Sequence, residues 1–98
     1  SERRPFDVYT DQFTVTITPF GANLSFAARE PHPSLGRAPQ SEHLGTVRMS
    51  VEHLKTMIVV ISRQIRRVEE QTAIRVEVPR DILNQLGISP EDWDAFWR

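Results

Sequence analysis

The chain has 98 residues, a formal net charge of −1 and no cysteine. This length predicts one domain, residues 1–98, with a modest core. The near-neutral charge excludes a global field that would draw the whole chain to nucleic acid or membrane. Without cysteine there are no disulfides, thiolate nucleophiles or cysteine-ligated metals, which fits a reducing compartment such as the cytoplasm. The longest apolar run, residues 57–61, is far shorter than the roughly 20 residues that span a membrane, and no signal peptide is recognisable.

Two alternating segments near the start predict an antiparallel hairpin. Residues 13–18 alternate apolar side chains with threonine, which predicts a strand whose Phe13, Val15 and Ile17 point inward. Pro19 to Gly21 break the pattern, and residues 23–26 alternate again.

Residues 30–43 hold three prolines and few apolar side chains. They predict a long loop that is either mobile or functional. Residues 46–49 then alternate again and predict a third strand.

The clearest helical pattern follows Ser50, a good N-cap residue. We expect a helix from Val51 to about Thr72. Its apolar positions recur at intervals of three and four on one face: Val51, Leu54, Ile58, Ile61, Ile65 and Val68. Met57 and Val60 add a second flank, which predicts a partner.

The C-terminal part, residues 73–98, predicts short elements. Residues 74–78 alternate and predict a fourth strand or an extended segment, and a helical turn after Pro79 ends at Gly87. Ser89 caps a second helix. That helix carries three aromatic side chains that either cap the domain's own core or anchor a partner: Trp93, Phe96 and Trp97.

Together these elements predict an α+β fold. We expect an antiparallel sheet of three to four strands packed on one long helix, followed by two short C-terminal helices. The strands and the long helix fall in residues 8–72.

Sites for chemistry are scarce in the sequence. His32, His43 and His53 have no second metal ligand three or four residues away. There is no glycine-rich phosphate loop and no serine in a nucleophile elbow. We therefore expect no enzyme, no metal site and no cofactor.

A basic cluster on the long helix has two interpretations. Arg63, Arg66 and Arg67 would form a solvated face or a contact for anions such as nucleic-acid phosphates. Acidic residues follow at positions 69 and 70, so the solvated face is favoured.

Two local resemblances accompany these patterns. The segments at residues 47–55 (VRMSVEHLK) and 65–69 (IRRVE) resemble a small prokaryotic family known as domain of unknown function 3467, over residues 8–70. That resemblance implies a fold and a prokaryotic origin but no activity. Residues 74–88 are similar to a segment of swapped-hairpin transcription regulators, although those continue into Gly-Asp where this chain has Glu91 and Asp92.

The sequence thus predicts a non-catalytic interaction or adaptor module that forms a homodimer or higher oligomer. Its expected surfaces are the long helix, a free sheet edge and the aromatic tail. A small regulator that binds nucleic acid through the arginine cluster is the alternative. No membrane partner is expected.

Overall fold

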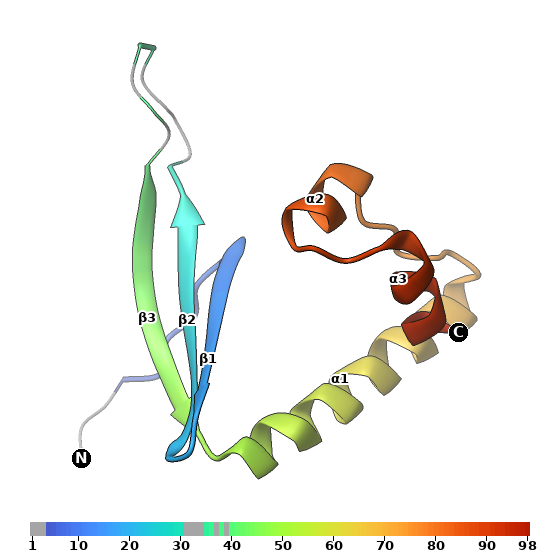
Figure 1. Ribbon diagram of the computed structural model, residues 1–98, viewed down its shortest axis with the longest axis horizontal. Coiled ribbons are helices and arrows are strands. Elements are labelled where there is room, and N and C mark those ends of the chain that lie inside the picture. Colours follow the sequence, from blue (N-terminus) through green and yellow to red (C-terminus); the bar gives the residue numbers. More distant parts are fainter. Residues whose placement is uncertain (1–3, 31–34, 37, 39) are drawn as a thin grey trace. The chain divides into compact units, whose positions relative to one another are not determined.

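The computed structural model describes residues 4–30, 35, 36, 38 and 40–98. In these described residues three strands are followed by three helices (Figure 1). They are β1 (Gln12–Thr18), β2 (Gly21–Arg29), β3 (Ser41–Met49), α1 (Val51–Thr72), α2 (Arg80–Gln85) and α3 (Pro90–Trp97). The α+β class is confirmed. The chain divides into two compact units, residues 1–56 and 57–98, here called the N-terminal and C-terminal units. The single domain stays a prediction.

The N-terminal unit holds one antiparallel sheet with the order β1-β2-β3. β1 and β2 form a hairpin that closes with Thr18 opposite Gly21. Gly21 has a φ of +143°, and a Cβ built there would lie 3.0 Å from the Met49 carbonyl oxygen. Only glycine adopts that φ readily, so this position holds the hairpin close to the end of β3.

β3 is longer than the sequence predicts. It begins at Ser41, so Glu42 and His43 belong to the strand and not to the loop expected over residues 30–43. The register shifts between Phe26 and Ala27, where β3 contributes an extra residue to the ladder. The bulge changes the phase of the strand, and residues 41–44 show no apolar alternation, so the sequence pattern does not reveal this part of β3. Residues 31–34, 37 and 39 of the expected loop lie outside the described residues, and whether the loop is mobile or functional stays a prediction.

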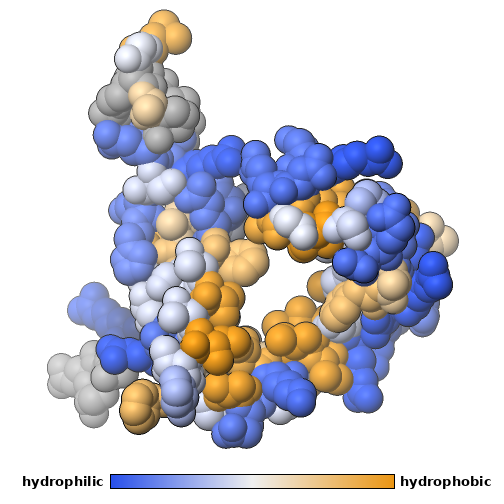
Figure 2. Space-filling view, viewed as in Figure 1, coloured by the Kyte–Doolittle hydropathy of each residue, from blue (hydrophilic) through white to orange (hydrophobic). Residues whose placement is uncertain are grey.

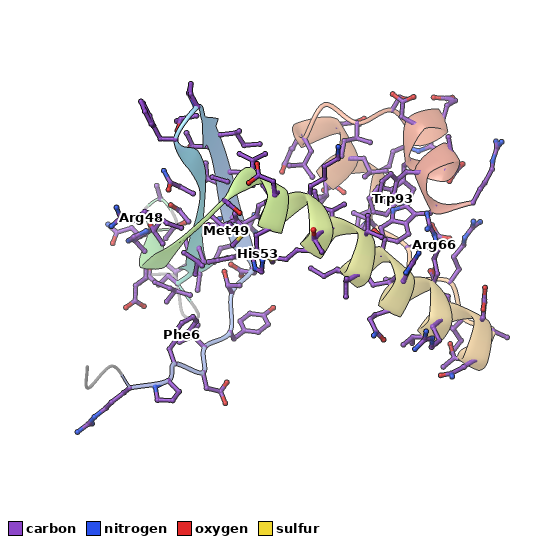
Figure 3. The ribbon with its side chains drawn as sticks, turned by 90° about the horizontal axis from the view of Figure 1, so that it is seen from below. Phe6, Arg48, Met49, His53, Arg66 and Trp93 are labelled. Atoms are coloured by element: carbon purple, nitrogen blue, oxygen red, sulfur yellow. The ribbon has the colours of Figure 1, made fainter. Side chains whose placement is uncertain are left out.

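The register sorts the sheet into two chemically distinct faces. Partners across an antiparallel pair share a face. One face therefore carries an apolar set: Phe13, Val15, Ile17, Ala22, Leu24, Phe26, Val47 and Met49. The opposite face is polar, and there the Ser25 and Thr46 hydroxyls lie 2.9 Å apart. Figure 3 shows Arg48 and Met49, neighbours in β3, on opposite sides of the sheet.

The helix boundaries follow the capping residues. α1 spans Val51–Thr72 as predicted, and the Ser50 hydroxyl accepts a hydrogen bond from the His53 amide at 3.1 Å. α3 begins in the same way, because the Ser89 hydroxyl accepts from the Asp92 amide. α2 is followed by Gly87 with a φ of +72°.

Residues 74–78 form an extended segment and not a fourth strand. The Val76 amide donates to the Glu69 carboxylate of α1 at 2.7 Å. A side chain thus takes the hydrogen bond that a neighbouring strand would otherwise provide. No helix in the described part of the chain is both long and apolar enough to cross a membrane.

Candidate interaction surfaces

Few apolar side chains are buried among the described residues. They are Ala22 and Leu54 in the N-terminal unit and Leu83 in the C-terminal unit. The buried polar side chain of Ser62 donates to the Ile58 carbonyl in α1. A core this small leaves much apolar surface open in both units.

The apolar face of the sheet is one such open surface in the N-terminal unit. Phe13, Val15 and Ile17 are 64%, 42% and 60% exposed. They share one face as the sequence predicts, but they are not buried: β1 is one of the two outer strands of the sheet, so it has a neighbouring strand on one side only. Figure 2 shows hydrophobic residues gathered along the strands.

A hollow of about 260 Å³ opens beside the β2–β3 pair in the N-terminal unit. Phe6 and Val8 of the N-terminal segment line it together with Phe26, Leu44 and Val47. The Thr10 hydroxyl and the Asp11 amide both donate to the Ala27 carbonyl, which holds this segment at the end of β2. Sequence reasoning missed it, because residues 4–9 show no periodic pattern.

In the C-terminal unit, Arg66 connects α1 to the aromatic tail. Its Nη2 donates to the Phe96 carbonyl oxygen at 2.5 Å, and its guanidinium carbon lies 5.8 Å and 5.7 Å from the ring centroids of Phe96 and Trp97. The Trp97 ring contacts Phe96 edge-on at 5.0 Å and Trp93 at 5.8 Å. Figure 3 shows Arg66 of α1 and Trp93 of α3 in the space between these two helices.

The tail therefore packs on α1. Trp93 and Trp97 are half-buried, and Phe96 remains 51% exposed. Between them, the two tryptophans contact Arg66 and the other aromatic side chains of α3, and the choice between the two interpretations of these aromatics stays a prediction. The exposed Phe96 is the member of the set that still offers surface to a partner.

The predicted flank of α1 is only partly open. Met57 is half-buried, whereas Val60 is exposed. Four neighbouring positions in the C-terminal unit are each about half exposed: Ile58, Val59, Ile61 and Val68. The open surface on this helix is thus a broad band and not the pair that the sequence singled out.

The three arginines of the basic cluster have different surroundings. Arg63 and Arg67 are exposed, whereas Arg66 is half-buried in its contact with the aromatic tail. Their spacing in the sequence groups the three arginines, but Arg66 contacts Phe96 and Trp97 of α3. A hollow of about 360 Å³ beside it mixes signs, because Glu69 and Glu70 line it together with Arg75 and Arg98. This mixture favours no anion strongly.

No group of three or more metal-ligating side chains comes together in the described residues. His53 lies in the first turn of α1, and His43 lies in β3 with its Nε2 3.4 Å from the Thr46 hydroxyl. His32 lies outside the described residues.

Comparison with models of known protein families, with curated proteins and with solved structures finds no match to this chain.

Proposed function

We propose that the chain is a non-catalytic interaction module that assembles with further copies of itself. The observation that supports this most directly is the exposed apolar face of the sheet. A sheet with one apolar face is stable when another layer covers that face. Full burial of Phe13, Val15 and Ile17 from their present exposure would contribute about 2.5–5 kcal/mol, a useful fraction of a typical folding free energy.

The distribution of polar groups supports a binding role over a chemical one. The polar face of the sheet carries hydroxyls and amides in neighbouring pairs, such as Ser25 with Thr46. The hydrogen bonds of such groups are made to each other and to water, so these groups are satisfied without a bound substrate. We place the module in the cytoplasm, because its sequence has no cysteine.

Sedimentation velocity over a range of protein concentrations tests the proposal. We expect an oligomer at micromolar concentration. Ile17→Thr should weaken the oligomer, because Ile17 lies on the open apolar face. If the chain were a monomer, the same substitution at an exposed position would change its stability little. Ile74→Thr is the matched control, since Ile74 is 68% exposed and lies in the other unit. A wild-type chain that stays monomeric at high micromolar concentration would refute the proposal.

A further inference from the structure

The two outer strands of the sheet differ in how well they resist pairing with another strand. Unpaired strand edges invite pairing, and proteins usually protect them with charges, prolines or bulges. β3 has such protection: it carries Glu42, His43 and Arg48, and its ladder with β2 contains the bulge. β1 reads Gln-Phe-Thr-Val-Thr-Ile-Thr, with no charge, no proline and a regular register along its whole length.

From this difference we infer that two copies of the chain join through β1, antiparallel and edge to edge, into one six-stranded sheet. The inference rests on the proposed self-assembly and specifies its contact. Because the strands meet at their edges, the side chains of Phe13, Val15 and Ile17 are covered from the side by those of the other copy, which buries them in part and not in full. Main-chain hydrogen bonds would connect the strands, as in other cases of strand addition.

The sequence of β1 makes a second copy the occupant that fits best. With the two-fold axis at Val15, that residue lies opposite its own copy, Phe13 lies opposite Ile17, and Thr14 lies opposite Thr16. Every apolar side chain of β1 then meets an apolar one, Thr14 meets Thr16, and Thr18 meets Gln12. The apolar faces of the two sheets become continuous, and no like charges face each other.

β3 cannot pair with itself in this way. His43 lies opposite Ala27 on the polar face, and Val47 lies opposite Leu24 on the apolar face, although both positions are odd-numbered. The bulge between them changes the phase of the strand, so a two-fold axis at a residue of β3, like the one at Val15 of β1, cannot match the faces on both sides of the bulge. After β1 has paired, the remaining edges are the two protected β3 strands. The assembly therefore closes as a dimer and does not extend into a filament.

Lysine substitutions on the polar face test the inference without changing the apolar face. Thr14→Lys with Thr16→Lys places each lysine opposite a lysine of the other copy, and both threonines are exposed in the chain alone. We expect the dimer to dissociate about tenfold more readily or not to form, because like charges opposite each other oppose pairing. Ser41→Lys with His43→Lys is the matched control, since it changes two exposed positions two residues apart on the polar face of β3. It should leave the dimer unchanged.

Hydrogen exchange of the wild-type protein gives a second measurement that needs no variant. In a two-fold pair, the alternate β1 amides that face away from β2 become hydrogen-bonded. We expect protection of every amide from Phe13 to Ile17, increasing with protein concentration.

The outcomes separate the two proposals. A dimer that the β1 lysines dissociate and the β3 lysines do not supports both. An oligomer that persists with the β1 lysines, or whose outward β1 amides exchange freely, overturns edge pairing and leaves self-assembly standing. A monomeric wild-type chain overturns both. If the β1 variant fails to fold by circular dichroism, the wild-type exchange pattern decides.

Discussion

Arg66→Met should detach the aromatic tail from α1. The hydrogen bond from the guanidinium to the Phe96 carbonyl involves a charged donor, a class that contributes about 1.5–3 kcal/mol. The contacts with the Phe96 and Trp97 rings contribute about 0.5–1 kcal/mol each at partly exposed sites. Against this, the buried Nε of Arg66 has no hydrogen-bond partner among the described residues, which costs about 1 kcal/mol or more. The net loss should be about 1.5–4 kcal/mol, since methionine keeps the apolar stem but loses the hydrogen bond and both ring contacts.

The two tryptophans of the chain, Trp93 and Trp97, both lie in α3, so tryptophan emission reports on this helix alone. We expect a red shift in Arg66→Met and a lower urea midpoint, measured at one fixed protein concentration because assembly changes apparent stability. Arg67→Met is the control, because Arg67 is the adjacent arginine and is exposed. The reasoning fails if both variants unfold within about 0.5 kcal/mol of each other with the same emission maximum, the range expected for surface substitutions.

Two further predictions concern backbone positions. Gly21→Ala should destabilise the sheet by about 1–3 kcal/mol, because the backbone has a φ of +143° and the new Cβ would meet the Met49 carbonyl; urea denaturation followed by circular dichroism measures this, and an unchanged midpoint would contradict it. Ser50→Ala and Ser89→Ala should each cost about 1 kcal/mol through loss of an N-cap. Only Ser89→Ala should also shift tryptophan emission, and an emission change in Ser50→Ala would contradict this assignment.

The elements best predicted from sequence are those fixed by local chemistry. α1 has the predicted boundaries because Ser50 caps it and the apolar period of three and four is unbroken. β1 agrees with the predicted strand except that it begins one residue earlier, at Gln12. This agreement follows because the alternation of apolar side chains with threonine is an unambiguous pattern with a period of two. The start of α3 follows from Ser89 and Pro90 together.

The features that sequence did not predict depend on contacts between distant segments. β3 extends back to Ser41 because β2 continues as its partner, and no pattern within residues 41–45 indicates that pairing. Glu69 holds the Val76 amide across seven residues, so the alternation of residues 74–78 does not lead to a strand. Arg66 was grouped with Arg63 and Arg67 by spacing, yet its surroundings depend on the position of α3. Local patterns predict elements, whereas the partners of each element come from tertiary structure.

The open apolar face of the sheet has a thermal consequence. Burial of apolar surface carries a negative heat-capacity change, and its driving force weakens on cooling. An assembly that covers Phe13, Val15 and Ile17 should therefore lose affinity in the cold room, with an association enthalpy that becomes less favourable as the temperature falls. Samples purified at low temperature would then contain more dissociated chain than the same protein at its working temperature.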